Sequence, residues 1–298
     1  PPGEIGCAQI QGILQDLKLP IVYPGGQATL LERSCDVVRL HAELMNENLE
    51  CRIASGDYTE ILDGVFVPKE EDARPKIGDY FVADTKAGPI ILSQNVQIGP
   101  FCFMRGPVYI GPNSKINEHS AIKDNVSISS VCKVGGEVEA TTIEPYSNKQ
   151  HHGFLGHSYL GSWVNLGAGT CNSDLKNSYK EVMQETSAGK FPSQMQFLGC
   201  VVGDYSKTAI NTSIFTGKTI GACSLAYGFV TTAVPSFVNY ARSFGQITEI
   251  SVELMIATQE RMFVRRNVKQ RPCDVKLLRD MFELTRCERQ LASEPLSL

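Results

Sequence analysis

A strict period of six runs from Leu92 to Val138, and it constrains the fold of this chain more than any other feature. Every sixth residue is apolar, and the residue four places after each of them is small or β-branched. The first column consists of Leu92, Ile98, Met104, Ile110, Ile116, Ile122, Ile128 and Val134, and the second of Val96, Cys102, Val108, Ser114, Ser120, Val126, Cys132 and Val138. Because 42% of the chain is hydrophobic, an unbroken apolar column of this length would arise by chance about once in a thousand tries.

Neither an α-helix nor an ordinary β-strand places residues six apart on one face over such a length, because their side-chain periods are about 3.6 and 2. A coil of three short parallel strands does, since each six-residue unit forms one side of a triangle and roughly 18 residues complete a turn. The sequence therefore predicts a mainly β fold, a parallel β-helix of hexapeptide repeats with the first column in its core. Gly99, Gly111 and Gly135 follow first-column residues and are expected at corners with positive φ.

The period divides the chain into three parts. Residues 1–88 precede it and are predicted to be an N-terminal helical and irregular lead-in, with apolar residues at helical spacing near 10–17 and 30–45. Residues 89–234 are predicted to form the β-helix. In residues 235–298 the period becomes helical, which predicts two C-terminal helices that cap the end of the coil.

Two interruptions break the period inside the β-helix. The phase is lost after Val138 and returns at Phe154, which lies 20 residues after Val134 and therefore two residues beyond three whole units. This mismatch predicts a loop near 139–153, and a polar stretch predicts a second loop near 173–196. Loops on one face of a solenoid commonly carry its functional site.

The composition argues against several classes of protein. A formal net charge of −4 and a pI near 5.8 do not suit a nucleic-acid-binding surface. The sequence contains no run of about 18 apolar residues and no basic segment followed by an apolar run, so we expect neither a membrane span nor a signal peptide. The ten cysteines form no disulfide framework and no CxxC metal pattern, which favours free thiols in a reducing cytoplasm.

Three of the five histidines, His151, His152 and His157, lie within seven residues. Around them the sequence reads Tyr-Ser-Asn-Lys from Tyr146, Gly-Phe-Leu-Gly-His-Ser-Tyr-Leu-Gly from Gly153 and Asn-Leu-Gly-Ala-Gly-Thr-Cys-Asn from Asn165. These motifs resemble the acyltransferase half of the bifunctional N-acetylglucosamine-1-phosphate uridyltransferase/glucosamine-1-phosphate acetyltransferase. They are more closely similar to a set of bacterial relatives of that enzyme, described as sugar nucleotidyltransferases, over about residues 85–240.

The resemblance implies a left-handed β-helix and a homotrimer whose sites are shared between subunits. It also implies transfer of an acyl group from acetyl-CoA or another acyl-CoA to an amino-sugar phosphate or a nucleotide sugar. Counting back from Asn165 places His151 on the family's catalytic base, whereas counting forward from Lys149 places His152 there. As a neutral imidazole, either side chain would take the proton of the attacking sugar amine.

The resemblance further assigns binding roles. Lys149 would hold the sugar phosphate, and Asn172 would orient the base or bind the acyl group. Phe154 stands where the family has a tyrosine that contacts the sugar. The residues assigned to substrate binding besides Lys149 are Asn165, Phe154, Lys207 and Asn211.

Two alternatives to acyl transfer stay open. The Phe154 replacement and the lack of Ile-Gly repeats between Thr208 and Ile214, where the resemblance implies the CoA site, favour a non-catalytic nucleotide-sugar-binding relative. The other alternative is the C-terminal part of a sugar-1-phosphate nucleotidyltransferase. The chain contains no Gly-rich nucleotide-binding loop after an opening strand, so it lacks the motif that the nucleotidyltransferase part itself would need. Whether the chain is an enzyme therefore stays open between these interpretations.

A zinc site is the third alternative. His119, His152 and His157 broadly resemble the zinc ligands of carbonic anhydrases built on the same β-helix, whereas acyl transfer needs no tightly bound metal. A basic cluster near the C-terminus would meet the phosphates of CoA or a nucleotide, or would form a solvated helix face. Its members are Arg261, Arg265, Arg266, Lys269 and Arg271.

Overall fold

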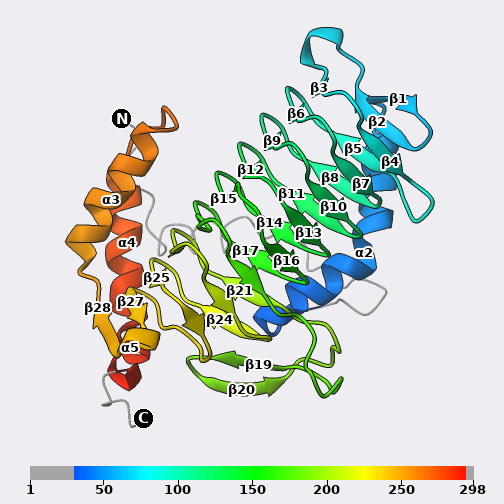
Figure 1. Ribbon diagram of the computed structural model, residues 1–298. Coiled ribbons are helices and arrows are strands. Elements are labelled where there is room, and N and C mark those ends of the chain that lie inside the picture. The colour runs from blue at the N-terminus through cyan, green and yellow to red at the C-terminus, as the bar shows by residue number, and fades with distance from the viewer. Residues whose placement is uncertain (1–29, 293–298) are drawn as a thin grey trace, which may run out of the picture. The chain divides into compact units, whose positions relative to one another are not determined.

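Short parallel strands stacked in successive coils form the body of the protein (Figure 1). The computed structural model describes residues 30–292, and residues 33–298 belong to one compact unit, to which the following description refers. The helix predicted near 10–17 lies outside the described residues. Within them, no helix is long and apolar enough to cross a membrane.

The coils present three faces, which we name A, B and C. Face A is one sheet of eleven strands, in the order β1 (Tyr58–Leu62), β2 (Val65–Pro68), β5 (Ile90–Leu92), β8 (Val108–Ile110), β11 (Val126–Ile128), β14 (Thr142–Ile143), β17 (Tyr159–Leu160), β21 (Cys200–Val202), β24 (Lys218–Ile220), β19 (Met183–Thr186) and β20 (Gly189–Pro192).

Faces B and C each consist of two sheets. Face B contains β3 (Lys76–Ile77), β6 (Gln97–Ile98), β9 (Lys115–Ile116), β12 (Lys133–Val134) and β15 (Asn148–Lys149), then β22 (Lys207–Thr208), β25 (Leu225–Ala226), β27 (Val238–Ala241) and β28 (Gln246–Glu249). Face C contains β4 (Val82–Asp84), β7 (Phe103–Arg105), β10 (Ala121–Lys123), β13 (Glu137–Glu139) and β16 (Phe154–Gly156), then β18 (Cys171–Asn172), β23 (Ser213–Ile214) and β26 (Phe229–Val230). Bridges of Asn165 to Asn148 and to Lys207 join the two sheets of face B.

The apolar column of the sequence fills the interior of the coils, which confirms the predicted parallel β-solenoid. Each of its eight members is at most 4% exposed, and the members of the second column are buried beside them. Strands one coil apart pair in parallel with these residues in register, as Met104 does with Ile122. The left-handedness stays a prediction from the resemblance.

The corner glycines have a different role from the predicted one. Positive φ falls on non-glycine residues such as Phe101 (φ 58°) and Asn113 (φ 59°), and not on Gly99 or Gly111. A Cβ at Gly99 would lie 2.5 Å from the backbone nitrogen of Glu118, one coil away. These glycines are therefore required by the close approach of the next coil rather than by their own dihedral angles.

The loop predicted near 139–153 is absent, because the segment stays in the coil. Val138 pairs with Ile122, and Lys149 pairs with Val134. Each of these pairs is fewer than 18 residues apart, so the corners here are shorter than in the preceding coils. The inner residue of the next strand is Leu155, and Phe154, predicted inside, points outward.

The second predicted interruption does leave the coil. After Asn172 the chain forms the antiparallel hairpin of β19 and β20 before it returns to the coil in β21. Glu185 of β19 pairs with Lys218 of β24, and their side chains form an ion pair of 2.5 Å. Lys218, which breaks the apolar period, therefore faces outward toward the hairpin.

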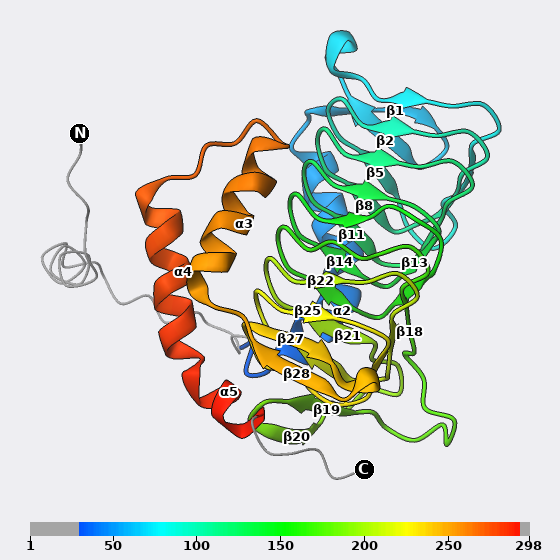
Figure 2. The same cartoon turned by 60° about the vertical axis from the view of Figure 1, so that its left-hand side comes forward.

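Helices cover two sides of the coil (Figure 2). Helix α2 (Ser34–Ala54) packs on face A, where Met45 and Leu49 contact Ile91. Helices α3 (Val252–Val264), α4 (Pro272–Leu284) and α5 (Arg286–Ala292) follow the last strands. Phe263 of α3 packs against Trp163, so the predicted C-terminal cap also covers part of face B. Two short 3-10 helices lie at Glu71–Ala73 and Arg242–Phe244.

Candidate functional site

A pocket of about 550 Å3 lies on face B beneath the C-terminal end of α3. Its floor is formed by outward side chains of neighbouring coils, among them those of Lys133, Asn148 and Asn165. Arg265 and Arg266, which directly follow α3, form part of its wall. This size lies within the usual range for small-molecule pockets.

The pocket is cationic. Lys133, Lys207, Arg265 and Arg266 line it, and no described carboxylate does so. Burial, followed by the charges of Arg266, Lys115 and Arg265, lowers the pKa of Lys133. Burial also lowers the pKa of Lys207 to about 8, although its Nζ donates a 2.9 Å hydrogen bond to the carbonyl of Tyr205. The pocket is therefore suited to an anionic ligand.

Two further contacts hold the pocket in shape. Arg266 donates a 2.7 Å hydrogen bond to Oδ1 of Asn148, which ties the segment after α3 to the coil. The ring of Trp163 lies between those of Tyr146 and Phe263, with centroid distances of 4.3 and 4.5 Å. Because both faces of the indole are covered, this wall has little freedom to move.

Some of the predicted site residues meet at this pocket. His151, Asn165 and Lys207 line it, and the His151 side chain is exposed. His152 lies at the neighbouring corner, where Nε2 is 3.3 Å from the place that a Cβ on Gly169 would take. Asn211 approaches the same glycine: its Oδ1 would lie 2.2 Å from a Cβ there, so the absence of a side chain on Gly169 leaves room for Asn211 and His152.

Lys149 lies apart from them, inside the coil. It occupies a position of the apolar column and is 2% exposed. Its Nζ donates hydrogen bonds to the carbonyls of Gly135 (2.7 Å) and His151 (2.9 Å), and burial lowers its pKa to about 8. In this arrangement the ammonium fastens a shortened corner, and its contact with a sugar phosphate stays a prediction.

The structure also contains a histidine–carboxylate pair that the sequence analysis did not find. Nδ1 of His157 lies 2.8 Å from Oδ2 of Asp174, and the two side chains are 21% and 16% exposed. Phe197 stacks on the imidazole at 5.1 Å, and no described residue bonds to Nε2. The sequence does contain a signal for this pair, because His157 and Asp174 are 17 residues apart. In the later coils a separation of this size places one residue directly beside the other.

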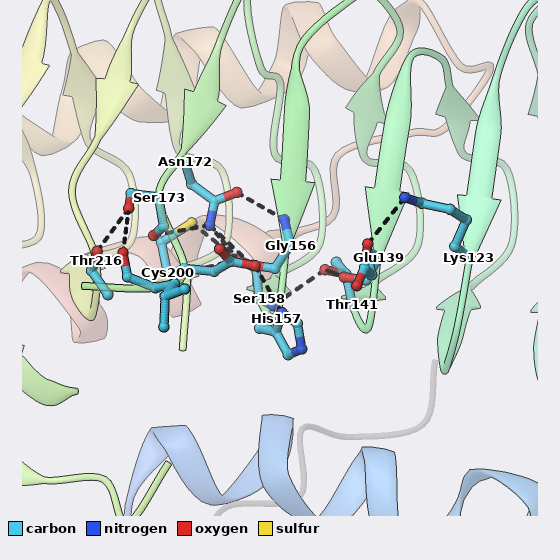
Figure 3. Close-up of polar contacts among 12 residues, drawn as sticks. Lys123, Glu139, Thr141, Gly156, His157, Ser158, Asn172, Ser173, Cys200 and Thr216 are labelled. Atoms are coloured by element: carbon cyan, nitrogen blue, oxygen red, sulfur yellow. Dashed lines mark hydrogen bonds and ion pairs between the residues drawn. The ribbon is translucent and has the colours of Figure 1, made fainter. Parts of the chain in front are cut away.

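Asn172 holds the segment that carries His157 (Figure 3). Its Oδ1 accepts a hydrogen bond from the amide of Gly156 (2.8 Å), and its Nδ2 donates one to the Gly156 carbonyl (2.9 Å). The amide of Asn172 is buried and replaces an apolar residue of the inner column. It therefore positions His157, and not His151 or His152.

Gly156 explains how the carboxylate reaches the imidazole. A Cβ at this position would lie 2.6 Å from Oδ2 of Asp174 and 2.3 Å from the ring of Phe154. Any larger residue would displace one of them. Phe154 thus packs beside the His157–Asp174 pair from the outer side of β16.

The three histidines of the zinc alternative are dispersed in the chain. The exposed ring of His119 stacks on Phe101 at 5.2 Å, and His157 is paired with Asp174. Within residues 30–292 of a single chain, no group of three histidine, cysteine or acidic side chains could hold a metal ion. A site shared between subunits would need a second copy of the chain.

Comparisons with known proteins identify sequence relatives of part of the chain. No family model matches the chain. It is 31% identical over 144 residues to the bifunctional protein GlmU of Acaryochloris marina. This matched region covers 46% of this chain and 28% of that protein. It is also 31% identical over 117 residues to the bifunctional sugar-1-phosphate nucleotidylyltransferase/acetyltransferase of Sulfurisphaera tokodaii, which covers 39% of this chain and 28% of that protein.

Among solved structures, the polysialic-acid-specific acetyltransferase NeuO shares 16% identity over 63% of this chain and 88% of its own, with a TM-score of 0.29. The chain spans less than a third of the length of these two curated relatives. Over the matched region, the chain is a sequence relative of the bifunctional GlmU proteins and of a sugar-1-phosphate nucleotidylyltransferase/acetyltransferase, built as a hexapeptide-repeat β-solenoid.

Proposed function

We propose that the chain transfers an acyl group from acetyl-CoA or another acyl-CoA to the amine of an amino-sugar phosphate or a nucleotide sugar. The pairing of His157 with Asp174 carries this proposal, because a carboxylate-oriented imidazole is the usual base for such a step. The names of the sequence relatives, which include an acetyltransferase, support it.

The geometry suits His157 as the general base. With Nδ1–H donated to Asp174, the lone pair of Nε2 would accept the proton of the attacking amine. A C–N bond would form at the thioester carbonyl, and the C–S bond would break. The proton on Nε2 would then pass to the departing CoA thiolate. Asp174 and Asn172 act as positioning residues in this scheme.

His151 and His152 stay the second candidates for the base, because His151 lines the pocket on face B and His152 lies at its corner. Asn165, Lys207 and Asn211 would then contact the sugar substrate.

The proposal includes a homotrimer. The pocket lies on face B, whereas His157 lies at the corner between faces C and A. A neighbouring subunit would bring the two together, as the shared sites of the resembling family imply. Analytical ultracentrifugation tests this part: a species of one chain at working concentration would contradict it.

We also propose a cytoplasmic location and a reaction without a tightly bound metal. The nine cysteines of the described residues are all free, which suits a reducing compartment. Thioester aminolysis by a histidine base requires no metal ion.

Thiol release from acetyl-CoA tests the reaction, with glucosamine-1-phosphate and an amino-sugar nucleotide as acceptors and metal-free buffer. We expect His157→Ala to lower kcat by roughly 100-fold or more, and Asp174→Asn to lower kcat with little change in KM. His119→Ala, an exposed histidine away from the pair, is the matched control. Full activity of His157→Ala with loss in His151→Ala would move the base to face B.

A binding protein for nucleotide sugars is the second candidate function. The separation of the cationic pocket from the His157–Asp174 pair within one chain favours it. Binding of UDP-N-acetylglucosamine by calorimetry, with no binding of acetyl-CoA and no thiol release, would support this function and contradict acyl transfer.

A further inference from the structure

The cations of the pocket on face B lack the neutralising partners that surface cations commonly have. Within residues 30–292, no carboxylate forms an ion pair with any of the four cations, which are Lys133, Lys207, Arg265 and Arg266. By contrast, Arg271 and Arg279, which also lie in the C-terminal part of the chain, have acidic partners. The pocket therefore concentrates positive charge where the fold itself supplies no counter-charge.

This arrangement works against the stability of the empty pocket. Lys133 is half-buried, and burial together with the like charges of Arg266, Lys115 and Arg265 disfavours its charged form. Groups that raise the energy of the free protein in this way are characteristic of binding sites. An anion in the pocket would remove the repulsion.

The cations are also held ready for a ligand. Arg266 is fixed by its hydrogen bond to Asn148, and Nζ of Lys207 is anchored on the Tyr205 carbonyl. Amide groups of Asn148, Gln150 and Asn165 line the same pocket. Guanidinium and ammonium groups arranged around amides are suited to phosphate oxygens, which accept several charge-assisted hydrogen bonds at once.

We infer that this pocket binds the pyrophosphate group of a nucleotide-containing ligand, with Lys133, Lys207 and Arg265 as its cationic contacts. Its volume of about 550 Å3 exceeds what a lone phosphate fills, and its four cations exceed what one phosphate neutralises. CoA and a nucleoside-diphosphate sugar both carry a pyrophosphate, so either would supply it. The inference rests on the charge and shape of the pocket, and it holds whether or not the protein transfers acyl groups.

Calorimetry of the full chain tests the inference with inorganic pyrophosphate, UDP and coenzyme A, and with inorganic phosphate at equal ionic strength. We expect Arg265→Gln and Lys133→Gln each to weaken pyrophosphate binding roughly tenfold, as the loss of one charge-assisted hydrogen bond would. Arg261→Gln is the matched control, because Arg261 lies one turn earlier in α3, bonds to Thr258 and does not line the pocket.

A second control distinguishes the loss of a cation inside the pocket from the loss of a positive charge nearby. Lys115 neighbours Lys133 in the sheet but does not line the pocket. We expect Lys133→Gln to raise the midpoint of thermal unfolding of the ligand-free protein while it weakens pyrophosphate binding. Lys115→Gln should leave the binding within twofold of the unchanged chain.

Pyrophosphate, UDP and coenzyme A together identify which ligand supplies the pyrophosphate group. Displacement of coenzyme A by pyrophosphate without binding of UDP would assign the pocket to the acyl donor, and binding of UDP without coenzyme A would assign it to a nucleotide sugar. No binding of any probe below about 1 mM, or equal weakening by Arg261→Gln and Arg265→Gln, would overturn the inference.

Separate variants distinguish failure of pyrophosphate binding from failure of the proposed acyl transfer. His157→Ala should lower the rate of thiol release by roughly 100-fold or more and leave pyrophosphate binding unchanged, because His157 does not line the pocket. Turnover that is insensitive to Arg265→Gln and Lys133→Gln in both kcat and KM would contradict the pocket and leave acyl transfer intact.

Discussion

The coils before Val134 and those after it are built on the same triangle but from different inner residues. In the earlier coils the inner column is entirely apolar and the spacing is a constant six. In the later coils the corners shorten, and Lys149 and Asn172 enter the column, both buried. Each of the two bonds to backbone groups beside the candidate site.

The difference teaches how a solenoid can vary locally without losing its fold. A polar inner residue is tolerated where it satisfies backbone groups that would otherwise be buried without a partner. Lys149 does this for Gly135 and His151, and Asn172 does it for Gly156. The departures from the apolar period therefore lie where the chain positions its histidines.

Placing a lysine in a regular coil should break the comparison most severely. Ile116 is fully buried among apolar residues, so Ile116→Lys would bury an ammonium without the acceptors that Lys149 has. We expect a loss of more than about 4 kcal/mol in the free energy of unfolding, measured by urea denaturation. The control Ile116→Val should cost about 1 kcal/mol. A stable Ile116→Lys protein would show that the regular coils accept polar residues equally well.

Restoring an apolar residue in the later coils should also destabilise. Asn172→Leu would return the column to its period but leave the amide of Gly156 without its partner, and the Gly156 carbonyl would keep only the Ser158 hydroxyl as a donor. We expect a loss of about 3 kcal/mol in the free energy of unfolding. Asn165→Leu, at an exposed neighbouring position, is the control and should change it by less than about 0.5 kcal/mol. Stabilisation by Asn172→Leu would mean that the amide is merely tolerated.

Lys149 should give the stability a distinct pH dependence. Because its folded pKa of about 8 lies below the unfolded value of 10.5, the unfolded chain binds the extra proton between these values. The contribution is complete above pH 10.5 and is lost as the pH falls through 8, with a slope of up to about 1.4 kcal/mol per pH unit.

The test compares the unchanged chain with Lys149→Met by urea denaturation at several pH values from 7 to 9.5. The stability of the unchanged chain should rise relative to that of the variant as the pH rises above 8. Using the difference cancels the buried thiols of Cys132 and Cys223, whose raised pKa values act in the opposite direction. Lys115→Met, an exposed lysine on the same face, should show no such trend.

The smallest effect is expected at an outer corner of the regular coils. The rings of Tyr80, Phe101 and His119 stack at 4.8 and 5.2 Å, and Phe101 is 51% exposed. We expect Phe101→Ala to cost about 1 kcal/mol of unfolding free energy, measured by thermal unfolding. Ile210→Ala, 70% exposed and without a stacked ring, serves as its control. A cost above that of Asn172→Leu would reverse the ranking of inner and outer positions.

The sequence by itself determined the coil, because a period of six is a local property that each unit repeats with its neighbour. It predicted the inner column from Leu92 to Val134, a departure from the coil near 173–196 and helices at the C-terminus. It also singled out His151, Asn165 and Lys207, which meet at one pocket.

Only the tertiary structure decided what the later coils do. The corner lengths after Val134 depend on how the next coil packs, so the period alone predicted a loop where there is none and placed Phe154 inside. The pairing of His157 with Asp174 needs the register of two coils, and the pocket needs Arg266 to reach Asn148, 118 residues away in the sequence. Such contacts depend on packing between distant segments, which a repeat of six residues does not encode.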